Sequence, residues 1–527
     1  MCAAGRASLF RAAQNPSPLA LGDMSFDPTA RERKGVGKVS GRTLFEKSES
    51  LFFSAVALGS LVTFLRVASA VPLPFHLDFG EGPLLGTAVR VARGWGAYPQ
   101  PDKAPYVISP YGPIPYYIFA ALVKLFGVGF TAPRLFIVAS GVWCAVLIAL
   151  LVCHWTGSHA VGWAFGLLFL TRPTLQDWLF IMRVDLLGLA FSLTGLYLFA
   201  KSRRWYLPVP FFVAGFFCKF TLLAAPFACL MHAFSKRDWG KALKFAVCVA
   251  IPSALIVLLL QWETGGWFVF HAISANAGHP HSLVGGVVRS WPQLMLDIPL
   301  LVAVIVLIYY EVINEAVSLP VFYVLASLLT TLAAVGKLGA SSNYFLEWEA
   351  ALCLGAGCGY AFLRRLFMKP GTRPAVLFGL LASLALANTR GPRVNEGPSA
   401  PWVTAPSAFT LSGCGLAYEY VKSYRGEQIL SESVGPLVMA GKPAIVFEPF
   451  LWTREVLRNG WPDTRVVNLI RSREIQLIIL SNDAEIMKRD PNHERWPPSV
   501  PGAIEDNYKL TRIFDCAESS FAYEPKP

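Results

Sequence analysis

The stretch that decides the fold covers residues 51–82 and reads LFFSAVALGSLVTFLRVASAVPLPFHLDFGEG. Residues 51–71 carry one charged side chain, Arg66, and are long enough to cross a bilayer as a helix. Asp78 and Glu81 follow directly, beside Gly80 and Gly82. Carboxylates this close to a spanning segment are costly unless they face water, a cation or a substrate. The stretch therefore predicts a membrane helix followed by an acidic functional site.

Composition places the whole chain in the same class. Of its 527 residues, 54% are hydrophobic and only 15% are charged, against about 25% charged residues in soluble domains. Apolar runs of spanning length recur, for example at 135–152, 242–260 and 320–335. The net charge of +12 does not indicate a nucleic-acid partner, because the basic residues cluster in short segments between apolar runs. The sequence predicts an integral membrane protein.

The positions of these basic clusters predict the topology. Basic residues precede the first span, which places the N-terminus in the cytoplasm, and the clusters at 201–204, 236–244 and 364–373 belong on the same side. This arrangement requires that 114–126 lies in or on the membrane without crossing it. We expect a polytopic α-helical protein with about eleven spans: 51–71, 135–152, 160–170, 186–200, 206–217, 222–234, 242–260, 294–310, 320–335, 345–363 and 375–387.

Three regions follow from this pattern. Residues 1–48 are expected to be a disordered basic cytoplasmic tail, and 49–390 a transmembrane domain with a large first outer loop at 72–133. Residues 391–527 are expected to form a small extracytoplasmic α/β domain. Predicted strands at 428–433, 443–447 and 476–481 alternate with helices at 415–424, 453–460 and 464–473, which suggests a parallel sheet. Cys414 and Cys516 would be paired only in an oxidising compartment, so their state stays open.

The topology gathers the remaining polar residues at the outer membrane boundary, although it depends on the basic clusters alone. These residues are Asp78, Glu81, Asp177, Arg183, Asp185, Lys219, Lys337, Asn343 and Glu347. One outward-facing polar site is the simplest interpretation.

Several of these residues suit particular chemistry, and each also has a structural interpretation. Asp78, partly removed from water beside glycines that let a ligand approach, suits general-base work, or it begins a hydrated loop. Arg183 suits a bidentate phosphate contact, or it forms an interfacial ion pair with Asp185. Lys219, between two apolar stretches, neutralises a bound anion or extends to the membrane surface.

The segment 337–347, KLGASSNYFLE, combines a cation, an amide and a carboxylate, which favours a ligand contact over a plain connecting loop. Tyr111 belongs to a Pro- and Tyr-rich segment, 108–117, that would anchor the first outer loop at the interface. His271, His279 and His281, with Glu263, lack a helical His pair, so a solvated loop is favoured over a metal site.

The order of these motifs resembles the GT-C superfamily of bacterial membrane glycosyltransferases. It is similar to the group of dolichyl-phosphate-mannose-protein mannosyltransferase-like and aminoarabinose-transferase-like enzymes. The resemblance covers 51–387 and rests on DFGEG at 78–82, the Pro- and Tyr-rich loop, RVD at 183–185, a lysine in a Phe-rich hairpin, and KLGASSNYFLE. DFGEG is not the Asp-Glu pair of the O-mannosyltransferases, so the acceptor type is not carried over.

The resemblance implies transfer of a sugar from a polyprenyl-phosphate donor to an acceptor hydroxyl, with inversion, at the outer face of the bacterial inner (plasma) membrane. The acceptor would be a lipid, a glycan or a protein. No cofactor is expected, although a divalent metal is possible in this superfamily. The implied roles are a base for Asp78; a sugar contact or tuning of Asp78 for Glu81; phosphate binding for Arg183, Lys219 and Lys337; and substrate contacts for Asp185, Asn343, Glu347 and Tyr111.

Two other functions stay open from the sequence. A secondary transporter would also have many spans and buried charges, but it should show inverted repeats with interrupted helices, and no such internal symmetry is visible. A non-catalytic envelope assembly protein would tolerate replacement of Asp78 by Asn without loss of phenotype.

Overall fold

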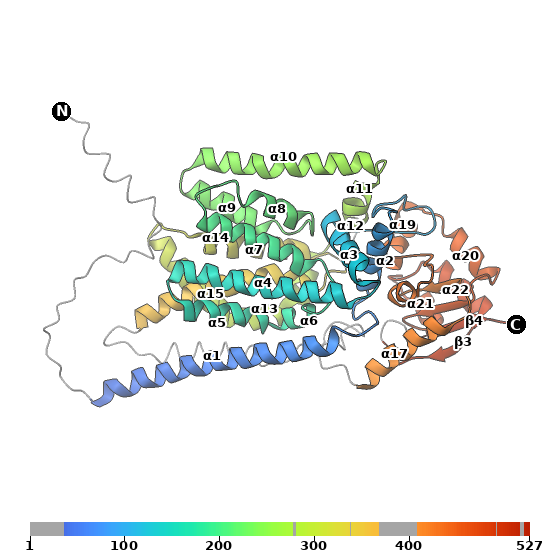
Figure 1. Cartoon of the computed structure of the whole chain (residues 1–527), viewed down its shortest axis with the longest axis horizontal. Helices are drawn as coiled ribbons and strands as arrows, with labels where there is room; N and C mark the ends of the chain where they lie inside the picture. Colours follow the sequence, from blue (N-terminus) through green and yellow to red (C-terminus); the bar gives the residue numbers. More distant parts are fainter. Residues whose placement is uncertain (1–35, 278–280, 338, 368–407, 492, 517–520) are drawn as a thin grey trace.

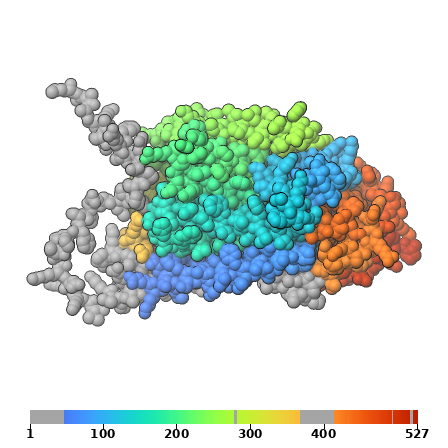
Figure 2. Space-filling view, viewed as in Figure 1, coloured from blue at the N-terminus to red at the C-terminus, as the bar shows by residue number. Residues whose placement is uncertain are grey.

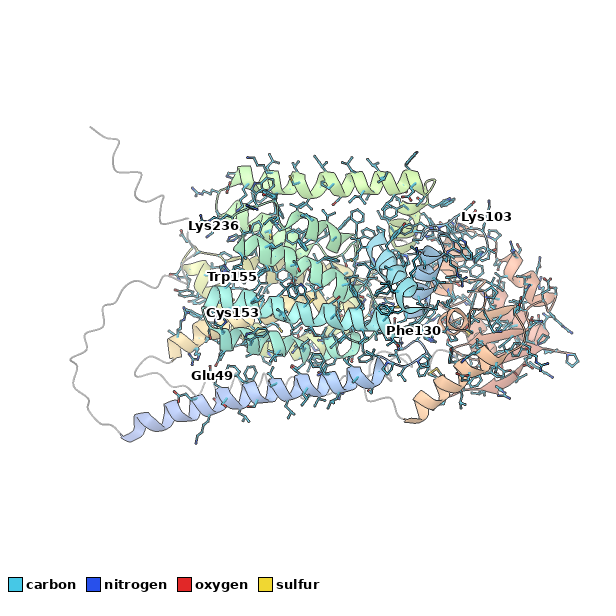
Figure 3. The ribbon with its side chains drawn as sticks, in the orientation of Figure 1. Glu49, Lys103, Phe130, Cys153, Trp155 and Lys236 are labelled. Atoms are coloured by element: carbon cyan, nitrogen blue, oxygen red, sulfur yellow. A yellow bond between two sulfur atoms is a disulfide. The ribbon has the colours of Figure 1, made fainter. Side chains whose placement is uncertain are left out.

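The protein is described by a computed structural model over residues 36–277, 281–337, 339–367, 408–491, 493–516 and 521–527. Long helices run roughly side by side in one bundle, and a smaller region with a β-sheet lies at one end of it (Figure 1). Lys236 lies at the end of the bundle far from this sheet, whereas Lys103 lies beside it (Figure 3). The two ends of the bundle therefore differ in structure, because only one of them meets the sheet region.

The bundle and the segments that connect its helices contain these elements: α1 (Val36–Ala70), α2 (Glu81–Ala92), α3 (Pro113–Phe126), α4 (Thr131–Thr156), α5 (His159–Leu170), α6 (Pro173–Trp178), α7 (Asp185–Lys201), α8 (Val209–Phe216), α9 (Ala224–Ser235), α10 (Trp239–Glu263), α11 (Trp267–Val269), η1 (Phe270–Ser274), α12 (Ala275–Ala277), α13 (Leu283–Ile313), α14 (Leu319–Val335), η2 (Ser342–Phe345) and α15 (Leu346–Phe367).

Each predicted span from 51–71 to 345–363 overlaps one of these helices, and 114–126 is α3. Four helices of the described residues are long and apolar enough to cross a membrane: α1, α4, α10 and α13. Residues 36–48 of the expected disordered tail belong to α1, which begins at Val36. Residues 1–35 and the predicted span 375–387 lie outside the described residues.

Helices α1 and α10 lie at opposite edges of the bundle (Figure 2), and both expose large apolar side chains. On α10, for example, Leu255 is 60% exposed, Leu258 64% and Trp262 81%. An apolar stripe of this size is rare on a soluble monomer. It is the surface expected of a helix that faces lipid, in agreement with an integral membrane protein.

The C-terminal region has one four-stranded sheet with the order β1-β2-β4-β3. Its elements are α17 (Ala408–Ser423), β1 (Ile429–Ser431), α18 (Gly435–Met439), α19 (Pro449–Asn459), α20 (Thr464–Arg471), β2 (Leu477–Leu480), α21 (Ala484–Arg489), α22 (Ser499–Asn507), β3 (Tyr508–Ile513) and β4 (Phe521–Pro525). A disulfide joins Cys414 of α17 to Cys516, which follows β3. The two cysteines therefore pair, a question that the sequence left open.

The expectation of a parallel sheet holds only for β1 and β2. The sheet is mixed, because β4 runs antiparallel to both β2 and β3, and the sequence analysis predicted neither β3 nor β4. The predicted strand at 443–447 forms only isolated bridges. One of them pairs Val446 with Tyr106 of the first outer loop.

This bridge is part of a close contact between the C-terminal region and the first outer loop. The Tyr106 amide donates to the Ile445 carbonyl at 2.8 Å, and the Phe447 amide donates to the Tyr106 carbonyl at 2.9 Å. A Cβ at Gly82 would lie 2.5 Å from the Gly435 amide nitrogen, so only glycine lets α2 and α18 approach this closely. The segment that carries Asp78 is thus packed directly against the C-terminal region.

Candidate functional site

A cavity of about 780 Å³ lies between the helical bundle and the C-terminal region. Its size falls in the range typical of ligand pockets. Charged side chains from both regions line it: Asp78, Asp177, Arg183, Lys219, Arg289, Lys337, Glu448, Glu494 and Arg495. Tyr111 and Asn343 line it as well. Six of the nine sequence-predicted site residues therefore share one cavity.

Asp78 and Arg183 form the centre of its wall. The Arg183 Nη1 donates to Asp78 Oδ1 at 2.9 Å, and its Nη2 donates to the Tyr111 hydroxyl at 2.9 Å. A Cβ at Gly80 would lie 1.5 Å from Arg183 Nη1, so glycine at this position makes room for the guanidinium. The sequence predicted that Gly80 admits a ligand; the structure shows that it admits Arg183.

The Asp78 carboxylate is partly accessible, with 24% of its side chain exposed. Burial raises its pKa above the usual value, and the nearby Glu81 charge adds to this effect, whereas Arg183 and the Gly80 amide oppose it. A raised pKa makes a carboxylate a stronger base, and the Arg183 charge favours its ionised form. Asp78 thus combines access to the cavity with the properties of a general base.

Glu81, for which the resemblance implied a sugar contact or tuning of Asp78, is fully buried and is not among the residues that line the cavity. Its oxygens accept two hydrogen bonds from Arg134, at 2.9 and 2.6 Å, and one each from the Leu77 and Met182 amides, at 2.6 and 2.7 Å. Burial alone would raise the pKa of Glu81, but Arg134 and these hydrogen bonds lower it below its usual value. Glu81 joins the Asp78 loop to the segment before Arg183 and holds both in place.

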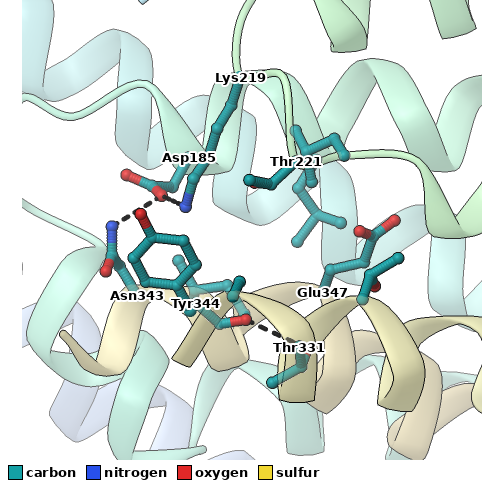
Figure 4. A pocket seen from close by; sticks show the side chains of 12 residues that line it. Asp185, Lys219, Thr221, Thr331, Asn343, Tyr344 and Glu347 are labelled. Atoms are coloured by element: carbon teal, nitrogen blue, oxygen red, sulfur yellow. Dashed lines mark hydrogen bonds and ion pairs between the residues drawn. The ribbon is translucent and has the colours of Figure 1, made fainter. Parts of the chain in front are cut away.

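Lys219, in the connection between α8 and α9, forms an ion pair with Asp185 at the start of α7 (Figure 4). Asn343 also donates to Asp185 Oδ1, at 2.9 Å, and the Lys219 ammonium lies 4.1 Å from the centre of the Tyr344 ring. Asp185 and Glu347 line a separate pocket of about 20 Å³, which has room for a single water molecule. The two carboxylates therefore lie behind Lys219 and Asn343. Neither lines the larger cavity, where both were expected to contact the substrate directly.

Lys337 approaches the cavity from the segment after α14. Its ammonium donates to Asn276 Oδ1 at 2.9 Å. Burial lowers the pKa of Lys337 to about 8, and the Lys219 charge contributes to this shift. Lys337 and Lys219 carry like charges, and no carboxylate among the described residues forms an ion pair with Lys337. A bound anion would therefore stabilise this part of the wall.

Sequence reasoning missed a second buried polar cluster behind the cavity wall. Arg172 pairs with Asp297 of α13 and lies 3.6 Å from Glu349 of α15. The Trp348 indole donates to Asp297 Oδ2 at 2.8 Å, and Thr174 donates to Glu349 at 2.9 Å. Asp297 could have been noticed, because it interrupts an apolar run in a predicted span. The cluster ties three helices together beneath the cavity.

The C-terminal region contributes Glu448 and Arg495, which sequence reasoning also missed. The Arg495 guanidinium lies 4.1 Å from the centre of the Phe79 ring, and its Nε lies 3.4 Å from Glu432 Oε1. Arg495 therefore contacts the residue next to Asp78. Glu448 and Arg495 are far from Asp78 in the sequence and meet it only in the folded chain, so no local sequence motif marks them.

The two described histidines of the outer loop, His271 and His281, have different contacts. His271 is buried, accepts from the Ser109 amide at 3.1 Å and lies 2.7 Å from the Pro99 carbonyl oxygen. His281 contacts the Ala333 carbonyl, and His279 lies outside the described residues. Within the part of the chain that the structure describes, no group of three or more His, Cys, Asp or Glu side chains is arranged to hold a metal ion.

No protein-family model and no curated protein matches the sequence. Among solved structures, the chain resembles ArnT from Cupriavidus metallidurans bound to undecaprenyl phosphate, with a TM-score of 0.56 and 12% identity over 89% of this chain and 97% of ArnT. The apo state of the same ArnT gives a TM-score of 0.51 and 13% identity over 90% and 97% of the two chains. The oligosaccharyltransferase AglB from Archaeoglobus fulgidus, in complex with an inhibitory peptide and a dolichol-phosphate, gives 0.49 and 11% over 90% and 74%. The likeness shows that the chain shares the overall fold of ArnT, in agreement with the fold that the sequence resemblance implied.

Proposed function

We propose that this chain is a membrane glycosyltransferase that moves a sugar, most simply a hexose, from a polyprenyl-phosphate donor to an acceptor hydroxyl with inversion. The observation that carries the proposal is the accessible Asp78 carboxylate, paired with Arg183 in a cavity that Lys219 and Lys337 also line. A base and several cations in one cavity suit the transfer of a glycosyl group away from phosphate. The GT-C fold, shared with a protein whose structure holds undecaprenyl phosphate, supports the same conclusion.

Asp78 would act as the base. It would remove the proton from the acceptor hydroxyl while the hydroxyl oxygen attacks the anomeric carbon from the face opposite the phosphate. The bond between the anomeric carbon and the phosphate oxygen then breaks, and its electron pair leaves with polyprenyl phosphate. The new glycosidic bond therefore has inverted configuration, and Asp78 holds the released proton.

The leaving phosphate needs cations more than it needs a general acid, because a phosphate monoester is already a weak base. Arg183 has donors beyond those used by Asp78 and Tyr111, and Lys219 and Lys337 extend the positive wall. In a poorly hydrated site, such fixed charges stabilise developing negative charge strongly. We assign the phosphate to these three residues, so the proposal requires no metal or other cofactor.

The remaining predicted residues divide by position. Tyr111 and Asn343 line the cavity and are proposed to contact the substrate. Asp185 and Glu347 are proposed to position Lys219 from behind, and Glu81 to position the Asp78 loop. These assignments separate groups that touch substrate from groups that act through a neighbour.

The topology stays part of the proposal. We propose about eleven spans in a bacterial inner membrane, a cytoplasmic N-terminus and an extracytoplasmic C-terminal α/β domain. The Cys414–Cys516 disulfide supports this side, because disulfides persist in oxidising compartments outside the cytoplasm. The site would then open to the outer leaflet, where the donor lipid inserts its tail between helices.

The test uses the full chain purified in nanodiscs with a panel of undecaprenyl-phosphate-linked hexoses and pentoses, together with the corresponding diphosphate-linked sugars. The proposal predicts release of free undecaprenyl phosphate from at least one monophosphate donor. Release only from diphosphate donors would contradict the donor class. No release from any donor, together with transport of a labelled solute across vesicles, would favour the secondary transporter instead.

A further inference from the structure

Glu448 lies at an unusual position for a buried acid. It precedes α19, which begins at Pro449, and it is only 8% exposed in the cavity wall. At this helix N-cap its side chain makes no capping hydrogen bond. Within the described residues, its carboxyl group forms no hydrogen bond and no ion pair with another side chain. Local structure therefore gives no reason for an acid here.

Glu448 lines the same cavity as Asp78 and Arg183, and the charges of these two residues act on its carboxyl group. Burial raises the pKa of Glu448 to about 8, against the opposing charges of Arg495 and Arg183, and the Asp78 charge raises it further. The two arginines have other partners, because Arg495 contacts Phe79 and Glu432 while Arg183 binds Asp78. Glu448 thus faces the site of Asp78 with its own hydrogen-bonding capacity unused.

The bundle wall and the C-terminal wall of the cavity carry different charges, which favour the sugar donor on one side and the acceptor on the other. Lys219 and Lys337 project from the helical bundle, where a lipid-linked phosphate would arrive. Glu448 projects from the C-terminal region, away from the lipid, and in its ionised form it would repel phosphate. A carboxyl group that is partly protonated near neutral pH both donates and accepts hydrogen bonds. This pattern matches neighbouring hydroxyl groups on a sugar ring.

We propose that Glu448 binds a hydroxyl group of a glycan acceptor and holds that acceptor against Asp78, so that the C-terminal region sets acceptor specificity. The inference rests on the proposed function and narrows it, because it selects a glycan from among the lipid, glycan and protein acceptors. Glu448 is a specificity residue in this scheme, since the proton of the reacting hydroxyl goes to Asp78.

The experiment compares Glu448→Leu, which removes both hydrogen-bonding oxygens, with wild type in nanodiscs, using octyl glycosides as polyol acceptors and octanol as an acceptor with a single hydroxyl. The matched control is Glu455→Leu, because Glu455 is buried in the same helix, bonds to Asn459 and does not line the cavity. Loss of one such hydrogen bond should raise the KM for the preferred octyl glycoside about tenfold. Transfer to octanol, hydrolysis of the donor by water and binding of undecaprenyl phosphate should stay within about twofold of wild type.

An unchanged KM for octyl glycosides in Glu448→Leu would overturn the inference while leaving the proposed function intact. Equal losses with octyl glycosides, octanol and water would also overturn it, because Glu448 would then act on the donor or on the fold. A matching loss in Glu455→Leu would indicate general disturbance of α19 and count against a direct contact. If wild-type protein releases no undecaprenyl phosphate under any condition, the proposed function itself fails and this inference fails with it.

Discussion

Breaking the pair between Glu81 and Arg134 separates a positioning role from a catalytic one. Both side chains are fully buried, and Glu81 accepts four hydrogen bonds, two of them from Arg134. Arg134 also donates to the carbonyls of Leu73 and Phe75, each at 2.8 Å. The pair therefore fixes the chain on both sides of Asp78. Glu81→Gln keeps the size of the side chain and leaves a buried arginine without its counter-ion.

The expected effect follows from this burial. Removing one partner of a buried ion pair destabilises a protein by about 3–5 kcal/mol, because the other charge stays buried without compensation. We expect this loss for Glu81→Gln and a similar loss for Arg134→Met. The double variant Glu81→Gln/Arg134→Met removes both charges together, so it should be no less stable than either single variant, a coupling of at least about 3 kcal/mol.

Thermal unfolding in detergent, followed by tryptophan fluorescence, measures the stabilities, and undecaprenyl phosphate release measures activity on the same samples. The folded double variant should recover part of the donor turnover that Glu81→Gln loses, because Asp78 is still present. Two results would refute this reasoning. Additive losses of stability would show that the pair is not coupled, and a stable but fully inactive double variant would mean that Glu81 itself takes part in the chemistry.

Two further predictions concern the cations. Burial lowers the pKa of Lys337 to about 8, so kcat/KM for the donor should fall as pH rises through about 8, because a neutral lysine no longer stabilises phosphate. Lys337→Arg keeps its charge at high pH and should move this fall upward by at least about one pH unit; an unchanged alkaline limb would remove Lys337 from phosphate binding. Because three protein cations are assigned to the phosphate, treatment with EDTA should leave donor turnover unchanged, and a loss that Mg²⁺ or Zn²⁺ restores would show that the site uses a metal.

The apolar helices of the bundle could be predicted because apolar runs act locally. A helix such as α4 (Thr131–Thr156) forms wherever a run is long and apolar enough, whatever its neighbours. The C-terminal sheet was harder to predict. β3 has mostly exposed residues and pairs with β4 at the end of the chain, so the strands depend on tertiary pairing more than on their own pattern. The mixed sheet was missed for this reason.

The candidate site also combines residues that the sequence predicts with contacts that depend on the tertiary fold. Arg183, Lys219 and Lys337 were found because charged residues at the boundary of a membrane are conspicuous. The buried contacts that support the cavity wall were not predicted, because no local pattern says that Glu81 binds Arg134 or that Asp185 lies behind Lys219. A sequence can therefore show which polar residues reach the boundary, but only the fold separates those that line the cavity from those that support it.

The most direct measurement is single-turnover release of undecaprenyl phosphate by Asp78→Asn in nanodiscs. The amide oxygen of the substituted side chain can still accept the hydrogen bonds from Arg183 and Gly80, so the substitution removes the base and keeps the geometry. Asp102→Asn is the control, because Asp102 is an exposed carboxylate of the same outer loop. With both variants folded, we expect Asp78→Asn to lose about 10²–10⁴-fold of the rate and Asp102→Asn to match wild type. Release by Asp78→Asn at the wild-type rate would contradict the assignment of Asp78 as the base.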